Sequence, residues 1–378
     1  MLRNGGPAIA CLAAAAVAAT SNGSARGTQH AARWCQARPS ESWQRILAHH
    51  IVPLSRTIAL NPMALANGGR SFFTEIFTKR FTGVAEIVAK TGAVTRIKAF
   101  PDPTPAVGAE NGDQAWGGFD GRWLVWKEFR GQTSFNRFTV WAWDSRTRKV
   151  RRIGAAQRGP NGEFWDSPWQ GVQVRGGIAV WVQGVGPDQR AEVHAYNLRT
   201  GRDTVVRNGH PANAFLLRHH VVVWFEASAP GTPTGIRAAS ALTGATVAVP
   251  PALRGVHDAF GFATDGLRIA YPDAAYKSLW WSASPARLPH EIVDAQGPNH
   301  IDNSVQIGGR YLGFGIEPRV FLADTKARRY VQVSARGGFM LLDESSLLVV
   351  YASGSKLDPI NEIVLIRQRD LPRVPACR

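Results

Sequence analysis

The chain has 378 residues, and 44 lysine and arginine residues against 28 aspartate and glutamate residues give it a formal net charge of +16. No block of five or more basic residues occurs, so the charge indicates either an evenly basic surface or an affinity for anionic polymers of a cell envelope, and we expect no nucleic-acid partner. No apolar run reaches the 18 residues that indicate a transmembrane helix.

Residues 1–25 are predicted to form a secretory signal peptide. Arg3 supplies the positive charge, residues 8–19 form a short apolar segment, and small and polar residues follow. A lipid on Cys11 is the alternative, but most of the apolar segment would then follow the modified cysteine. We therefore expect a secreted, extracytoplasmic protein with no transmembrane segment.

Residues 26–54 are predicted to be a lead-in segment with one short helix near Ser42–His49. Signal cleavage leaves two cysteines, Cys35 and Cys377, at opposite ends of the mature chain. In an oxidising compartment such a pair is most simply a disulfide, and two free thiols are the alternative.

Residues 55–378 contain one pattern seven times: an apolar strand that ends in an aromatic residue, a polar loop, and a second hairpin. The closing residues recur about every 45 residues, a period typical of propeller blades. They are Thr74 in a weaker first copy, then Trp126, Trp181, Trp224, Tyr271, Phe314 and Tyr351.

The second hairpin of each unit alternates apolar and polar residues around a tight turn, as half-buried antiparallel strands do. Each unit then has four strands, which predicts an all-β fold, a seven-bladed β-propeller of four-stranded antiparallel blades. The degraded first and last copies leave six or eight blades as alternatives. The last copy loses its outer strand at Pro372, and residues 57–60 could replace it from the N-terminal side.

The hairpin motif Asn-Leu-Arg-Thr-Gly (197–201) has partial copies at 90–92, 242–244 and 324–326. It resembles the outer hairpin of TolB-like propellers and their WD-repeat relatives. The resemblance covers about residues 55–372 and implies the fold, because such hairpins occur in propellers with unrelated roles.

Three histidines share one register of the repeat. His210, His257 and His300 each lie fourteen residues before the closing aromatic of their unit, which predicts that they meet at the rim of the channel. Neutral imidazoles from neighbouring blades can hold a divalent metal. The alternatives are that each histidine ties its loop to the next blade, or that the register is a coincidence.

A long loop between the second and third units, residues 159–169, contains two tryptophans that the repeat does not explain. Their rings could stack on sugar rings or on a protein partner, or could pack in the core. The predicted ligand-binding residues combine this loop with polar residues near the histidines: Trp165, Asp166, Trp169, Asn213, Asp258 and Asp302.

No nucleophile elbow, HExxH sequence, P-loop or EF-hand loop occurs, so the catalytic residues are unknown. We expect a monomeric, exported binding module for a protein or for an anionic or carbohydrate envelope polymer, with the ligand face formed by the inter-blade loops. One alternative is a metal-dependent lyase or hydrolase that uses the three histidines. Another is a structural component of a cell-surface complex.

Overall fold

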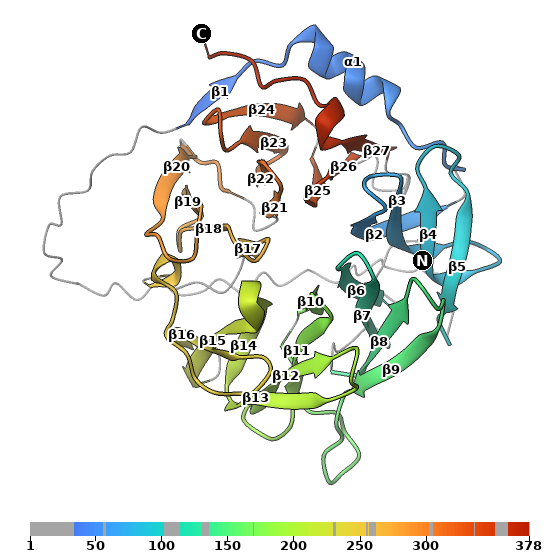
Figure 1. Cartoon of the computed structure of the whole chain (residues 1–378), viewed down its shortest axis with the longest axis vertical. Helices are drawn as coiled ribbons and strands as arrows, with labels where there is room; N and C mark the ends of the chain where they lie inside the picture. Colours follow the sequence, from blue (N-terminus) through green and yellow to red (C-terminus); the bar gives the residue numbers. More distant parts are fainter. Residues whose placement is uncertain are drawn as a thin grey trace, which may run out of the picture. The chain divides into compact units, whose positions relative to one another are not determined.

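The computed structural model describes residues 34–55, 58–101, 114–130, 136–168, 170–229, 232–254, 256, 262–295, 297–301, 305–335, 337–351 and 362–377. Seven sheets stand around a central channel (Figure 1), and their strands pair antiparallel except for one added strand in the sixth, which confirms the predicted seven-bladed propeller. Each blade begins with its innermost strand and continues outward through hairpins, so all innermost strands run in the same direction along the channel.

Four blades are four-stranded meanders. Blade 1 contains β2 (Ala59–Ala66), β3 (Ser71–Phe77), β4 (Thr82–Val88) and β5 (Val94–Ala99). Blade 2 contains β6 (Gln114–Phe119), β7 (Trp123–Phe129), β8 (Phe138–Asp144) and β9 (Val150–Ala155). Blade 3 contains β10 (Gln173–Arg175), β11 (Ile178–Gly184), β12 (Ala191–Asn197) and β13 (Asp203–Gly209). Blade 5 contains β17 (Ala263–Thr264), β18 (Ile269–Pro272), β19 (Ser278–Ser282) and β20 (His290–Asp294).

The other three blades depart from four strands. Blade 4 has β14 (Pro211–Leu216), β15 (Val221–Ala229) and β16 (Thr232–Ser240), and a single bridge from Ala239 to Thr246 stands at its fourth position. Blade 6 has β21 (Gln306–Gly308), β22 (Tyr311–Ile316), β23 (Arg319–Asp324) and β24 (Arg329–Ser334), and β1 (Cys35–Ala37) pairs parallel with β24 as a fifth strand. Blade 7 has β25 (Gly338–Leu342), β26 (Ser346–Tyr351) and β27 (Glu362–Arg367).

The hydrophobic core is divided into layers, one between each pair of neighbouring blades. The closing aromatics lie in these layers: Trp126 packs between blades 1 and 2, Trp181 between blades 2 and 3, and Trp224 between blades 3 and 4. The layer between blades 7 and 1 closes the ring with Leu348 and Phe72. Large apolar side chains at these positions fill the space between the faces of neighbouring sheets.

The outer hairpins turn at the glycines that the repeat contains. Gly92 and Gly201 have φ angles of +66° and +76°, which a residue without a Cβ adopts without strain.

The ring is closed by the segment before blade 1, although not by the residues expected. Ala59 and Leu60 belong to β2, the innermost strand of blade 1, so the prediction that residues 57–60 form the outer strand of blade 7 is wrong. That position is taken by residues 50–52: Ile51 bridges Val364, and the Val52 amide donates to the Ile363 carbonyl over 2.8 Å. Thr57 lies outside the described residues.

The predicted helix is present as α1 (Glu41–His49), which runs along the outside of the ring beside blades 6 and 7 (Figure 1). Its Trp43 is completely buried in the layer between these blades, and the indole nitrogen donates to the Arg373 carbonyl over 3.2 Å. Three 3-10 turns complete the secondary structure of the described residues: η1 (Arg218–His220), η2 (Pro251–Leu253) and η3 (Gln368–Asp370).

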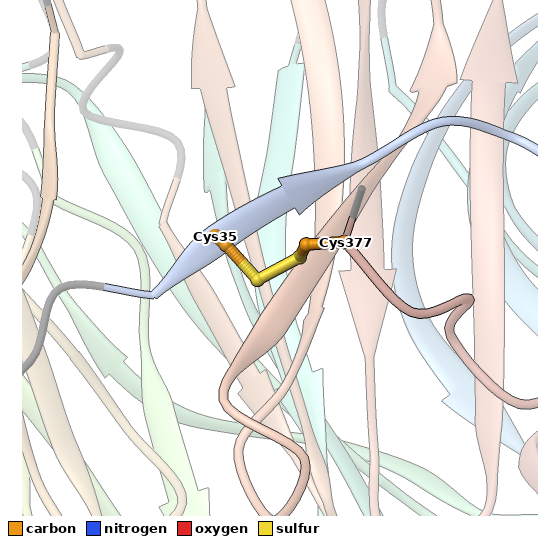
Figure 2. The surroundings of a disulfide bond; sticks show 2 residues. All are labelled: Cys35 and Cys377. Carbon is orange, nitrogen blue, oxygen red and sulfur yellow. A yellow bond between two sulfur atoms is a disulfide. The ribbon is translucent and has the colours of Figure 1, made fainter.

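Cys35 and Cys377 form the predicted disulfide, with their Cα atoms 6.2 Å apart (Figure 2). The bond joins β1 to the C-terminal segment and so links the two ends of the chain that wrap blades 6 and 7. Among the described residues, no helix is long and apolar enough to cross a membrane.

Candidate ligand-binding channel

The central channel contains a cavity of about 590 Å³, and all seven blades contribute residues to its wall. Most of its charged residues lie in the first turns, by which we mean the turns that join the innermost strand of a blade to its second strand. Binding cavities for small ligands commonly have volumes of roughly 300–1,000 Å³ and a few convergent polar groups. This cavity is therefore the candidate site.

Aspartates order three of the first turns. One oxygen of Asp120 accepts the backbone N–H groups of Arg122 and Trp123, and Asp265 and Asp343 make the equivalent pairs of bonds in blades 5 and 7. An aspartate that satisfies the backbone two and three residues ahead fixes a tight turn. These hydrogen bonds hold the backbone of the cavity wall in one turn conformation at these positions.

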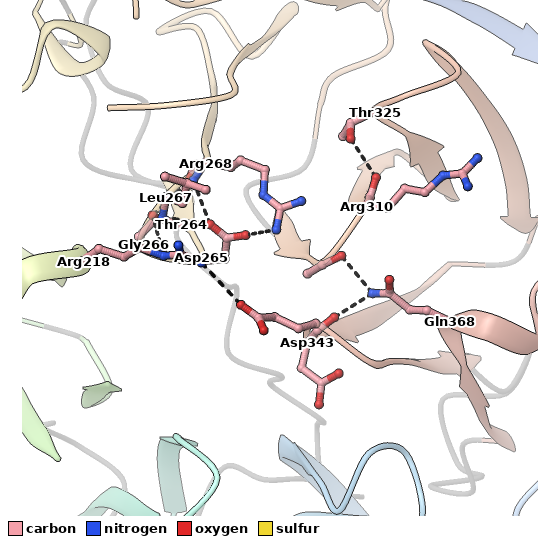
Figure 3. Close-up of polar contacts among 12 residues, drawn as sticks. Arg218, Thr264, Asp265, Gly266, Leu267, Arg268, Arg310, Thr325, Asp343 and Gln368 are labelled. Atoms are coloured by element: carbon pink, nitrogen blue, oxygen red, sulfur yellow. Dashed lines mark hydrogen bonds and ion pairs between the residues drawn. The ribbon is translucent and has the colours of Figure 1, made fainter. Parts of the chain in front are cut away.

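The carboxylates of Asp120 and Asp265 are also used by other partners. The second Asp120 oxygen accepts the Gly177 N–H over 2.7 Å, which ties blade 2 to blade 3. Asp265 forms an ion pair with Arg268 of its own blade (Figure 3). Both carboxylates therefore make direct contacts with groups other than Arg175.

Further contacts hold the turns of blades 6 and 7 together. The Gln368 amide donates to the carbonyls of Gly308 and Asp343, over 2.8 Å and 2.6 Å, and Figure 3 shows it beside Asp343. In blade 6, Arg310 forms an ion pair with the buried Asp324.

Arg175, the last residue of β10, is the one basic side chain among the described residues that line the cavity. Its half-buried guanidinium makes no hydrogen bond or ion pair in the described part of the chain, and it lies against Gly266 in the first turn of blade 5. Burial lowers the pKa of Arg175, and the nearby Arg218 lowers it further, whereas Asp265, Glu344 and Asp120 raise it. The side chain thus extends from blade 3 past blade 4 to blade 5.

Two glutamines add hydrogen-bonding groups to the same wall. Gln173 precedes Arg175 by two residues, so both side chains leave β10 on the same face, and Gln306 lies on β21. Both glutamines are half-buried, and their amide groups make no hydrogen bond in the described structure. A polar ligand in the cavity could therefore exchange hydrogen bonds with three planar side chains.

The repeat pattern does not single out these three residues. Arg175 stands six residues before its closing aromatic, and at that position blade 2 has Asp120, blade 4 has Arg218 and blade 5 has Asp265. A basic residue there is therefore no exception within the repeat, and Gln173 and Gln306 carry no sequence signal either.

His210 and His300 precede the innermost strands of their blades, whereas the charged cavity residues lie at the ends of such strands or just after them, so these two histidines and the charged residues belong to opposite faces of the ring. His210 is half-buried, and its Nδ1 atom is buried without a hydrogen-bond partner. His300 is exposed, and His257 lies outside the described residues. No group of three possible metal ligands occurs among the described residues.

The predicted ligand-binding residues are partly described. Trp165 is half-buried and packs against Gly159 of its own loop, and the exposed Asp166 accepts a hydrogen bond from Asn136. Asn213 is half-buried in β14. Trp169, Asp258 and Asp302 lie outside the described residues.

Neither a protein-family model nor a curated protein sequence matches this chain. Solved structures do. An oligogalacturonate lyase from Vibrio parahaemolyticus aligns with a TM-score of 0.53 at 10% identity, over 82% of this chain and 91% of that one. The β-propeller domain of the Trilobed protease from Pyrococcus furiosus aligns with a TM-score of 0.53 at 10% identity, over 82% and 95%.

TolB from Acinetobacter baumannii aligns with a TM-score of 0.38 at 13% identity, over 64% of this chain and 55% of that one, which is too distant to support further comparison. Identities of this order establish the fold and nothing more. The predicted resemblance to the propeller superfamily, which concerned the fold alone, is confirmed.

Proposed function

We propose that this protein is an exported binding module whose ligand occupies the channel cavity. The observation that carries the proposal is the cavity itself: seven blades enclose about 590 Å³, and Gln173, Arg175 and Gln306 bring hydrogen-bonding groups to its wall that no described residue uses. Binding cavities for small ligands commonly carry a few polar groups that are free to contact the ligand, so these side chains favour binding of a polar molecule.

Export is supported by two features. Residues 1–25 have the charge and apolar pattern of a signal peptide, and the disulfide between Cys35 and Cys377 belongs to an oxidising compartment. The ligand is then a component of the cell envelope, and the net charge of +16 favours an anionic or carbohydrate polymer.

The inter-blade loops on the opposite face would provide a second contact for a long ligand. Trp165, which is half-buried, and Asp166, which is exposed, lie in such a loop. They are followed by Ser167, whose hydroxyl accepts the Gly184 N–H over 2.8 Å. This bond anchors the loop to blade 3 and so limits its motion.

The test is binding of the purified mature protein to an array of neutral and acidic oligosaccharides. We expect saturable binding, and at least about tenfold weaker binding when Gln173→Leu and Gln306→Leu are combined, since each lost hydrogen bond costs on the order of 1 kcal/mol. Gln44→Leu, on the exposed side of α1, is the matched control. Absence of binding, or equal binding by the double variant, would refute the proposal.

A second candidate is a metal-dependent lyase or hydrolase, and the unpaired Nδ1 atom of His210 favours it, because a buried imidazole nitrogen without a partner is available to a metal. The proposed metal site consists of His210, His257 and His300. We expect stoichiometric metal in protein purified without chelator if this candidate is correct, and its loss from His210→Ala. Protein free of metal after dialysis against zinc or manganese would exclude this site.

A further inference from the structure

The cavity contains one cation whose charge is not balanced by a direct contact. The guanidinium of Arg175 lies so close to Gly266 that a Cβ atom there would stand 2.8 Å from its Cζ and Nε atoms and 3.0 Å from Nη1. Gly266 has a φ angle of +86°, which also favours glycine. The turn of blade 5 thus packs against the guanidinium in the cavity wall, and none of the described residues in this turn accepts a hydrogen bond from it.

The carboxylates near Arg175 are occupied elsewhere. Asp120 accepts three backbone N–H groups, and Asp265 is paired with Arg268. Glu344 is largely exposed and lies 3.7 Å from Arg218 at the rim. A half-buried guanidinium without a direct partner is costly in a folded protein, and an anionic ligand would offset that cost.

The planar shape of the guanidinium and the negative charges in the cavity wall restrict the chemical class of the ligand further. Guanidinium groups bind carboxylates through two parallel hydrogen bonds in one plane. Four acidic residues lie in the same wall, Asp120, Asp265, Asp343 and Glu344, and they repel a multiply charged anion more strongly than a singly charged one. The amides of Gln173 and Gln306 can pair with hydroxyl groups, which donate and accept hydrogen bonds.

We infer that Arg175 binds the carboxylate of a sugar acid in the channel, with Gln173 and Gln306 binding its hydroxyl groups. This inference rests on the proposed function and adds the chemical class of the ligand. It makes Arg175 the residue that discriminates acidic from neutral saccharides.

The experiment is calorimetric titration with a uronic acid disaccharide and with its carboxyl-reduced neutral counterpart. We expect wild-type protein to prefer the acidic disaccharide by at least tenfold. Arg175→Gln should remove this preference, Arg175→Lys should restore part of it, and Arg146→Gln, at an exposed turn arginine, should leave it unchanged. The methyl ester of the acidic disaccharide, tested on wild-type protein, should bind as weakly as the neutral one and requires no substitution.

Equal affinities for the two disaccharides, or a preference that survives in Arg175→Gln, would overturn the inference. Competition by inorganic phosphate as strong as that by the uronate would also overturn it, since a tetrahedral anion would then fill the same place. Binding of the neutral disaccharide that depends on Gln173 and Gln306 would leave the proposed function intact while the inference failed.

Discussion

Lys127 places a basic group in a layer between two blades. Its side chain is completely buried, its ammonium donates to the Val182 carbonyl over 2.9 Å, and it lies 4.2 Å from the centre of the Phe138 ring. Burial lowers the pKa of Lys127 to about 7. The next residue, Glu128, points to the other side of β7 and pairs with Lys98 of blade 1 over 2.7 Å.

We predict that Lys127→Met raises the free energy of unfolding at pH 7 by about 4 kcal/mol. The unfolded lysine has a pKa near 10.5, so between pH 7 and 10.5 the unfolded chain binds a proton that the folded chain does not. Wild-type stability should therefore rise with pH across this window, and below pH 7 the full cost of the buried charge remains. Denaturation by urea at pH 7 and pH 10 measures the difference, which should shrink at pH 10.

The matched control for this prediction is Lys149→Met at an exposed turn position. If Lys127→Met and wild-type protein show the same pH dependence, Lys127 is not a buried titrating amine.

Glu226 illustrates how a buried carboxylate joins two blades. It is 7% exposed and accepts hydrogen bonds from Arg207 of blade 3 and from the Trp224 indole over 2.7 Å. Burial alone would raise the pKa of Glu226, but these hydrogen bonds lower it below its ordinary value. The stability that this carboxylate contributes is therefore present above about pH 4.5 and is lost as the pH falls.

Glu226→Gln should lower the free energy of unfolding at pH 7 by about 1–3 kcal/mol, because Arg207 loses its charged partner. Chemical denaturation should show that the difference from wild type narrows as the pH falls below 4. Glu362→Gln, at an exposed position of β27, should cost much less. A loss of stability that stays constant with pH would argue against the ionised state of Glu226.

At the scale of secondary-structure elements, the ring is closed by short additions to blades 6 and 7. The strand β1 pairs with β24, residues 50–52 pair with β27, and α1 covers the layer between them. The disulfide then links β1 to the C-terminal segment. These additions occupy the outer edges of the two blades, which would otherwise expose unpaired backbone groups.

We predict that replacing both cysteines by alanine lowers the free energy of unfolding by up to about 6 kcal/mol. The bond closes a loop with a sequence separation of 342 residues, and in the chain-entropy model the stabilisation grows with the logarithm of loop length. Urea denaturation of the variant and of wild-type protein measures it. Stability unchanged in the variant, with Cys35 and Cys377 confirmed as bonded in wild type, would show that the packing of α1 and β1 closes the ring without help.

At the scale of the whole molecule, the propeller is a ring of similar blades around one channel. Neighbouring blades contact each other through apolar layers, so each blade depends on two neighbours and the ring must close to bury them all. The cavity exists because seven innermost strands cannot meet at the axis.

Export is the prediction that belongs to this scale. Mass spectrometry of the protein from the producing cell should show a mature chain that starts near Arg26, because residues 1–25 have the pattern of a cleaved signal peptide. An intact chain that retains Met1 and accumulates in the cytoplasm would contradict it.

Local patterns were sufficient to predict the blades. Strand, turn and aromatic positions recur along the chain, and a meander pairs each strand with its neighbour in sequence, so Trp126 or Gly201 can be placed from a few residues on either side. The pairing of Cys35 with Cys377 followed from their number and from the oxidising compartment that the predicted signal peptide implies.

Contacts between distant parts of the chain decide which residues meet in the cavity and which segment closes the ring at blade 7. Arg175 meets Gly266 only because the ring brings blade 3 and blade 5 to one channel, and no local pattern encodes that distance. Residues 50–52 displaced the more strand-like residues 57–60 at the edge of blade 7, because Ala59 and Leu60 were needed to begin β2. Which segment fills an edge depends on the competing partners available in three dimensions, whereas strand propensity depends on the segment alone.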